Sequence, residues 1–204
     1  MNYFVTGIST EVGKTVVSAI LTEALKADYW KPVQAGDLED SDSHKIKRFI
    51  SNTKTVIHPN AYALNTPMSP HAAADIDSIH IDLEQIIRPE TNNHLVIEGA
   101  GGLLVPLNDE ATIMDLIQPA DKVVVVSRHY LGSINHTLLT VEKLLEKDLQ
   151  VGIIFSGDEH PTTESIILKK TQVPFLGRIN EEQGFDKATV KRYAEELRSN
   201  LLSF

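Results

Sequence analysis

Residues 3–15 of the chain, YFVTGISTEVGKT, decide the fold. The run at 3–6 is rich in β-branched and aromatic residues, which favours a strand. Apolar residues with helical spacing follow over residues 16–26, and the segment between the two holds two glycines, Lys14 and Thr15. This order predicts a phosphate-binding loop, because loop N–H groups and the dipole of the following helix both attract an anion.

The loop departs from the usual phosphate-loop spacing by one residue. The first glycine of the usual pattern would fall at Ile8, and the glycine of this chain, Gly7, comes one residue earlier. The alternative is a chance Gly-Lys-Thr at a helix start, which the preceding strand and following helix disfavour. In the favoured interpretation, Lys14 neutralises β- and γ-phosphate oxygens and the Thr15 hydroxyl binds Mg²⁺.

Short apolar runs alternate with helical patterns along the rest of the chain. The run at 122–127 is continuous rather than alternating, as in a parallel strand covered on both faces. We therefore predict an α/β fold: a single domain over residues 1–204 with a doubly wound, mostly parallel sheet and helices on both faces. The predicted strands are 3–6, 29–34, 94–98, 122–127, 151–156 and 174–179, and the segment 53–82, which is less regular, is expected to lie near the site.

Composition excludes several classes of function. The 19 basic and 28 acidic residues give a net charge of −9, which argues against nucleic-acid or anionic-lipid partners. The absence of cysteine excludes a disulfide framework and a thiolate nucleophile. The start of the chain has no signal-peptide pattern, and no apolar run could span a bilayer. A cytoplasmic protein without membrane contacts is expected.

Three charged residues outside the loop are candidates for phosphoryl chemistry. Glu98 ends an apolar strand and precedes a glycine-rich segment, where a carboxylate is costly unless it is paired or metal-bound. Asp42, taken alone, is better explained as a helix cap or a first-turn carboxylate, and only its place in a wider pattern makes it a candidate. Lys31 lies in the second predicted strand, just before Pro32, and it is either a solvated surface lysine or a second positive charge for a transferred phosphoryl group.

With these residues in place, the chain resembles the dethiobiotin synthetase family over nearly its whole length. The motifs that carry the resemblance are YFVTG at 3–7, TEVGKT at 10–15, KPVQ at 31–34, SPH at 69–71, VIEGAGG at 96–102 and LGSINHTLLT at 131–140. The phosphate loop alone would fit many families of ATPases. The motif at 131–140 reduces the number of families that fit.

The resemblance implies a homodimeric ligase of biotin biosynthesis that uses ATP and Mg²⁺. Its substrates would be 7,8-diaminononanoate and CO₂ or bicarbonate, and its product dethiobiotin. An amine and CO₂ would form a carbamate, whose oxygen attacks the γ-phosphate; the second amine would then displace phosphate and close the ring. Such chemistry asks the protein mainly for positioning and charge stabilisation.

The resemblance also implies roles for individual residues. Lys14 and Lys31 would be catalytic, and Thr15, Asp42 and Glu98 would bind Mg²⁺. The substrate would contact Lys31, Ala35, Ser69, Pro70 and, from the neighbouring subunit, the helix start at Gly132 and Asn135. The nucleotide would be bound by Glu11, Val12, Gly13, Lys14, Thr15, Val16, Asp42, Glu98, Gly99, Ala100, Gly101, Ile179, Asn180 and Glu181.

Three positions depart from the family pattern. Ala35 stands where Ser or Thr is common, Ser156 where an adenine-reading Asn is usual, and Asn180 where Pro is usual. A serine hydroxyl cannot replace both hydrogen bonds of an amide to adenine. We therefore predict weak discrimination between ATP and other nucleoside triphosphates, unless Asp158 or the loop 179–181 reads the base.

Two other functions fit parts of the pattern. A partitioning-type dimeric ATPase would share the fold, but the position of its signature lysine is Ser9, and the acidic composition suits DNA poorly. An inactive nucleotide-binding or scaffold module would explain Ala35 and Ser156. The full set Lys14, Thr15, Lys31, Asp42 and Glu98 argues against it.

Overall fold

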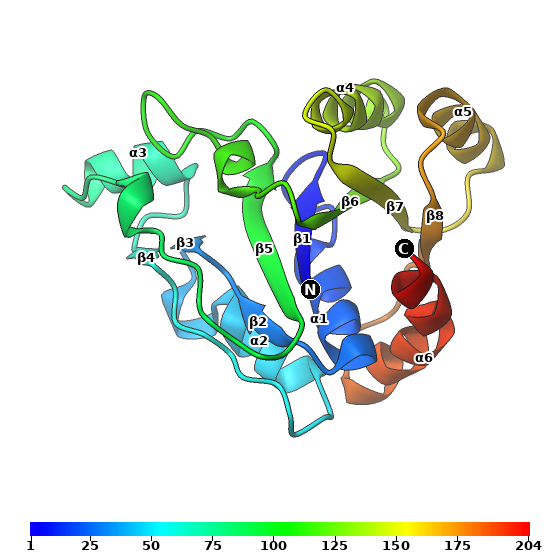
Figure 1. The fold of residues 1–204 in the computed structure, drawn as a ribbon, viewed down its shortest axis with the longest axis horizontal. Coiled ribbons are helices and arrows are strands. Elements are labelled where there is room, and N and C mark those ends of the chain that lie inside the picture. Colours follow the sequence, from blue (N-terminus) through cyan, green and yellow to red (C-terminus); the bar gives the residue numbers. More distant parts are fainter.

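The computed structural model describes the whole chain, residues 1–204, and its centre is a six-stranded parallel sheet. The strand order is β2-β5-β1-β6-β7-β8, so the chain leaves β1 toward one side and later returns to its other side (Figure 1). In open sheets of this kind, ligands bind at such a reversal, beyond the carboxyl ends of the strands. The strands are β1 (Asn2–Gly7), β2 (Asp28–Trp30), β5 (Leu95–Gly102), β6 (Lys122–Arg128), β7 (Gln150–Ser156) and β8 (Phe175–Ile179).

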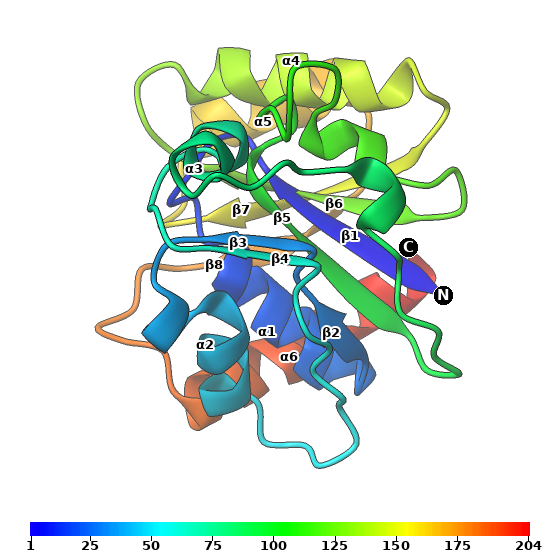
Figure 2. The ribbon, with the colours of Figure 1, turned by 90° about the vertical axis from the view of Figure 1, so that its left-hand side faces the viewer.

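Helices cover both faces of the sheet. Figure 2 shows α1, α2 and α6 on one side and α3, α4 and α5 on the other. The predicted fold class, α/β with a doubly wound parallel sheet, is therefore confirmed. The bounds are α1 (Lys14–Leu25), α2 (Asp42–Phe49), α3 (Pro70–Ile76), α4 (Ser133–Leu145), α5 (Pro161–Thr171) and α6 (Lys187–Ser203).

Burial on both faces explains the continuous apolar strands. All four residues from Val123 to Val126 in β6 have 0% exposure, because α1 and α6 pack below the sheet and α4 and α5 above it. Burying a valine side chain contributes roughly 1.5–3 kcal/mol relative to leaving it exposed. These strands therefore anchor the carboxyl edge on which the site is built.

The prediction of one strand over residues 29–34 is wrong. The chain forms β2 and then, after Lys31 and Pro32, a short strand β3 (Val33–Ala35) in a separate sheet with β4 (Tyr62–Leu64). Pro32 has no N–H to donate, so it cannot continue the ladder, and its carbonyl accepts from the N–H groups of Ala61 and Tyr62 instead. The break turns the chain at Lys31.

Other boundaries shift by small amounts. The first helix begins at Lys14 rather than at residue 16, and β5 runs on through the glycines to Gly102. The segment 53–82 holds β4 and α3, the latter with Pro70 in its first turn. Three short 3₁₀ helices complete the fold, at Leu38–Asp40, Leu83–Gln85 and Ile113–Leu116.

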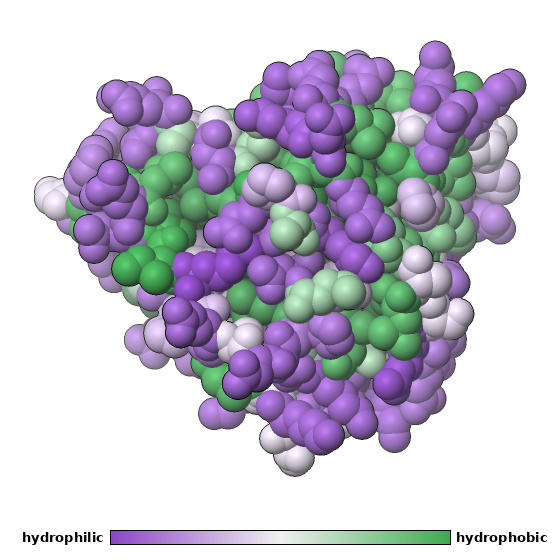
Figure 3. Space-filling view, viewed as in Figure 1, coloured by the Kyte–Doolittle hydropathy of each residue, from purple (hydrophilic) through white to green (hydrophobic).

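On the face that carries both termini, hydrophilic residues dominate the outer rim (Figure 3). No helix is long and apolar enough to cross a membrane.

Candidate functional site

A cavity of about 790 Å³ lies at the carboxyl edge of the sheet, around the loop between β1 and α1. This volume is within the range of ligand pockets. The structure brings together most of the residues predicted from the sequence. Those that line the cavity are Glu11, Gly13, Lys14, Thr15, Val16, Lys31, Ala35, Asp42, Ser69, Pro70, Glu98, Ala100, Gly101, Ile179, Asn180 and Glu181.

Four predicted residues lie outside the lining of this cavity. Val12 is buried under the loop, and the position a Cβ would take on Gly99 is 3.0 Å from Ile113 Cγ2, on the core side of β5. Gly132 and Asn135 are exposed at the start of α4. Neither Gly132 nor Asn135 lines the cavity of its own chain.

The loop leaves the start of α1 open to a ligand. Gly13, with φ of 95°, precedes the helix; no side chain caps it, and no acidic residue stands in its first turn. Gly7 is required because an added Cβ would lie 2.6 Å from Val12 Cγ2 and 2.8 Å from the Ser9 carbonyl oxygen. The first N–H groups of α1 therefore face the cavity without a competing side-chain acceptor.

Lys14 is held close to the loop by a backbone contact. Its ammonium group donates to the Ser9 carbonyl oxygen at 3.0 Å. Burial lowers the pKa of Lys14 to about 8, and the charges of Glu98 and Asp42 only partly offset this effect. A phosphate group in the loop would offer Lys14 the anionic partner that its buried position lacks.

Glu98 is the most buried acid of the site, and three side chains donate to it. Thr15 and Lys31 reach Oε1 at 2.9 and 3.1 Å, and the Tyr29 hydroxyl reaches Oε2 at 2.9 Å. Its exposure of 1% would be costly without these partners. Tyr29 was not singled out from the sequence, although its position two residues before Lys31 was a signal that both side chains face the same way.

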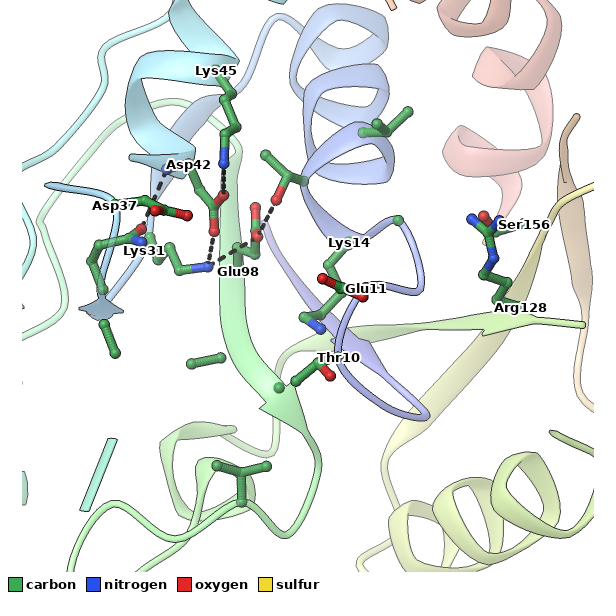
Figure 4. A pocket seen from close by; sticks show the side chains of 18 of the residues that line it. Thr10, Glu11, Lys14, Lys31, Asp37, Asp42, Lys45, Glu98, Arg128 and Ser156 are labelled. Atoms are coloured by element: carbon green, nitrogen blue, oxygen red, sulfur yellow. Dashed lines mark hydrogen bonds and ion pairs between the residues drawn. The ribbon is translucent and has the colours of Figure 1, made fainter. Parts of the chain in front are cut away.

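Asp42 completes the cluster from α2. Its carboxylate pairs with Lys31 and lies 3.4 Å from Lys45 Nζ (Figure 4). Burial alone would raise the pKa of Asp42, but the charge and hydrogen bond of Lys31, together with Lys45 and Thr15, outweigh it and hold the pKa below its usual range. Burial alone would lower the pKa of Lys31, but Glu98 and Asp42 raise it. The helix cap is Ser41, so Asp42 is a first-turn residue whose side chain is free to line the cavity.

This cluster can accept a hard cation together with a ligand. Two carboxylates and the Thr15 hydroxyl converge, and no group of three or more His, Cys, Asp or Glu residues is arranged to hold a metal alone. Mg²⁺ prefers six oxygen ligands and is commonly held by one or two carboxylates plus substrate phosphates and water. The residues present fit that arrangement.

The opposite end of the cavity is more exposed and differs in chemistry. Ser156 ends β7, and its hydroxyl would lie 2.9 Å from a Cβ placed on Gly13, so it borders the loop. Arg128 ends β6 and pairs with Glu181 at 2.6 Å. Arg128 was also missed, although it is a charged residue at the end of an apolar strand, the same signal that identified Glu98.

The fold and this loop define the class of protein. A parallel sheet with a glycine-rich loop joining its central strand to a helix, and a Lys-Thr pair at the helix start, characterises a P-loop nucleoside-triphosphate-binding protein. The family model described as AAA domain matches residues 1–189. Within this class, the chain belongs to the ATP-dependent dethiobiotin synthetase family.

Two relatives support this assignment. The chain is 64% identical to the ATP-dependent dethiobiotin synthetase BioD of Christiangramia forsetii over 201 residues, which cover 98% of this chain and 97% of the relative. It is 51% identical to BioD of Cytophaga hutchinsonii, with 97% of each chain covered. The family prediction from the sequence is therefore confirmed.

Solved structures agree on the fold. A putative plasmid partition protein from Borrelia burgdorferi, bound to AMPPNP, superposes with a TM-score of 0.58 at 13% identity and covers 99% of this chain and 98% of its own. A second plasmid partition protein from the same organism gives 0.57 at 16% identity, with 99% and 97% covered. At this identity the likeness shows the fold alone, and the family membership favours the ligase over a partitioning-type ATPase.

Proposed function

We propose that this chain closes the ureido ring of dethiobiotin from 7,8-diaminononanoate, CO₂ and ATP, releasing ADP and phosphate. The observation that carries the proposal is Lys31 held between Asp42 and Glu98 beside the open start of α1. In this proposal, the terminal phosphate of a loop-bound triphosphate lies beside this fixed positive charge and the two carboxylates. A cytoplasmic location belongs to the same proposal, since the reaction consumes ATP.

The proposed reaction has three steps. One amine of the substrate adds to CO₂ and loses a proton, which gives a carbamate. A carbamate oxygen attacks the γ-phosphorus as the bond to ADP breaks. The second amine then attacks the carbamate carbon and loses a proton, the C–O bond to the phosphoryl group breaks, and phosphate leaves as the ring closes.

Lys14 and Lys31 would stabilise the charge that develops on the transferred group. Both lie in the cavity wall at low exposure, 8% and 5%, where electrostatic interactions are less screened than in water. Lys31 cannot easily turn away, because it is bonded to two carboxylates. The cluster therefore holds this charge in place before substrate arrives.

Mg²⁺ is part of the proposal, with Thr15, Asp42 and Glu98 as its side-chain ligands. When bound, the ion would neutralise and orient the phosphate oxygens. Tyr29 would fix the Glu98 carboxylate from the side away from Thr15. A structure with bound nucleotide and Mg²⁺ tests this assignment: Asp42 lying more than about 6 Å from the ion would remove it from the site.

A homodimer is proposed because Gly132 and Asn135 lie outside the cavity of their own chain. The start of α4 has no side-chain cap and no acid in its first turn, which suits the carboxylate tail of the diamine. Exposed apolar side chains flank it, among them Leu131, Ile134 and Leu139. A two-fold contact through this region would bring Asn135 of one chain to the cavity of the other.

The decisive experiment measures ATP turnover with each substrate omitted in turn. Phosphate release should require both the diamine and bicarbonate, and dethiobiotin should form in equal amount. Turnover that ignores the diamine but responds to DNA would favour the partitioning-type switch. No turnover at all, with ATP still bound, would favour the inactive module.

A mixing experiment tests the dimer. A Lys14→Gln chain and an Asn135→Ala chain should each be weak alone, and mixed dimers should recover one good site. Subunit exchange is verified with differently tagged chains. Absence of recovery after verified exchange would place the tail-binding group within one chain.

A further inference from the structure

The cavity has two ends of different chemistry on either side of the loop. Lys31, Asp42 and Glu98 lie on one side, and Arg128 and Ser156 lie on the other (Figure 4). This inference rests on the proposed function, in which the reacting phosphate faces the first group. The nucleoside then extends toward the second group, and the question becomes what holds the base there.

Three neighbouring strands end together at this place. Arg128, Ser156 and Ile179 are the last residues of β6, β7 and β8, and they are aligned in register across the sheet. Arg128 and Glu181 therefore approach from the two strands that flank Ser156, and they meet at 2.6 Å between Nη2 and Oε1. The pair spans the end of β7.

The local backbone holds this pair over the cavity. The Gly157 N–H donates to the Ile179 carbonyl at 2.8 Å, and the Glu181 N–H donates to Asp158 Oδ1 at 3.2 Å. Gly157 has φ of 102°, and a Cβ there would lie 3.6 Å from Glu181 Oε1. The glycine gives the turn its conformation and leaves the surroundings of the carboxylate open.

The pair contributes little to stability. The side chains are 41% and 54% exposed, and ion pairs with that exposure contribute little to folding. The contact uses one guanidinium nitrogen and one carboxylate oxygen. Further N–H groups of Arg128 and Oε2 of Glu181 remain for a ligand in the cavity that both residues line.

We propose that Arg128 and Glu181 together bind the edge of the nucleobase. A donor and an acceptor side by side match the N7 acceptor and N6 donor of adenine, which is the match that Ser156 cannot make alone. Guanine and cytosine also present a donor next to an acceptor. The pair therefore strengthens binding of each base and selects weakly among them.

The test is direct binding of ATP, GTP, CTP and inorganic tripolyphosphate, measured by calorimetry without diamine. The chains are the wild type, Arg128→Ala, Glu181→Ala and a control, Arg192→Ala. The control breaks a pair of the same residue types, Arg192 and Glu182, also 2.6 Å apart but with an arginine outside the cavity lining. Melting temperatures confirm that each variant is folded.

Arg128→Ala and Glu181→Ala should each weaken all three nucleotides about tenfold, the range for a hydrogen bond to a charged group. Binding of tripolyphosphate, which has no base, should change less than about twofold, and Arg192→Ala should change nothing. Glu181→Ala is the most informative variant. If the residues acted only through charge, removing an anion would raise the affinity for every anionic ligand.

Three results would overturn the inference: unchanged nucleotide binding in both variants, an equal loss of tripolyphosphate in Arg128→Ala, or tighter binding in Glu181→Ala. None of these depends on ring closure. A wild type that makes no dethiobiotin yet shows the expected binding pattern would refute the proposed function and leave this inference standing.

Discussion

The two ends of the cavity differ in the burial of their charged residues and in the number of hydrogen-bond partners that these residues have. At the Glu98 end, the central charges Lys31 and Glu98 are buried and have several partners: Glu98 accepts from Tyr29, Thr15 and Lys31. At the Ser156 end, the charged residues are half-exposed, and Arg128 and Glu181 bind each other through one contact. The side chains of the Glu98 end are therefore held in place before a ligand binds, whereas those of the Ser156 end have donors and acceptors that are not yet used.

This difference partly parallels the family pattern. All the charged residues that the resemblance implies for phosphoryl transfer are present at the buried end, where the one departure is the uncharged Ala35, and the departures Ser156 and Asn180 lie at the exposed end. A buried, bonded charge tolerates no change, because removing one partner leaves another unpaired. At the exposed end, a different pair of side chains can replace the usual contact and bind the same ligand.

The largest effect is expected when the loop lysine is lost. Lys14→Gln should lower kcat/KM for ATP on the order of 100-fold or more, since a fixed charge that faces the transferred phosphate would be removed. Circular dichroism should show an unchanged fold. Lys26→Gln, at the other end of α1, serves as the control. Near-normal turnover of Lys14→Gln would refute its assignment.

The next effect concerns the support of Glu98. Tyr29→Phe removes the hydroxyl that donates to Oε2, so the Mg²⁺ concentration for half-maximal turnover should rise about 10-fold to 100-fold. Tyr3→Phe is the matched control, because this buried tyrosine donates to the Leu201 carbonyl away from the cavity. An unchanged Mg²⁺ requirement would show that Glu98 needs no support from Tyr29.

A smaller effect is expected in the scaffold of the exposed end. Glu164 of α5 accepts from Arg178 and His129, which neighbour Ile179 and Arg128 in sequence. Burial alone would raise the pKa of Glu164, but the hydrogen bonds from Arg178, the His160 N–H and His129, with the charge of Arg178, outweigh it and lower the pKa from 4.5 to about 2. Glu164→Gln should lower the free energy of unfolding at pH 7 by about 1–3 kcal/mol.

The pH dependence of this loss has a defined sign. Because the folded pKa is depressed, the stabilisation by Glu164 is complete above about pH 4.5 and is lost as the pH falls toward 2. Urea unfolding of wild type and Glu164→Gln should therefore converge over that window. Glu146→Gln, which breaks the exposed pair with Lys143, should cost less than about 1 kcal/mol. A pH-independent difference for Glu164 would contradict the assignment.

The smallest effect is expected at the base. The wild type should prefer ATP over GTP and CTP only weakly, and Ser156→Asn should raise that preference roughly threefold to tenfold by restoring an amide. Ser156→Ala should leave the preference as it is. The measurement is kcat/KM for the three nucleotides. A wild-type preference for ATP above about 100-fold would show that another group selects adenine.

The amino-acid sequence was sufficient to predict the fold class and the charged residues that gather at the Glu98 end of the cavity. Apolar runs with no polar alternation require a sheet covered on both faces, and the loop must follow the first strand, so local pattern sufficed. The glycines around Lys14 and after Glu98 could also be recognised locally. Backbone that approaches a ligand closely requires glycine, so a cluster of glycines in the sequence predicts such an approach.

Three features could be seen only in the folded chain. They are the turn at Pro32, the hydrogen bond from Tyr29 to Glu98, and the ion pair of Arg128 with Glu181 beside Ser156. Tyr29 and Glu98 are 69 residues apart, and Arg128 and Glu181 are 53 apart. Such pairs leave no periodic signal, because their distance depends on strand order and register rather than on spacing along the chain. The sequence therefore predicted the charged residues of the Glu98 end, whereas the order and register of the strands determine which distant side chains come together at each end of the cavity.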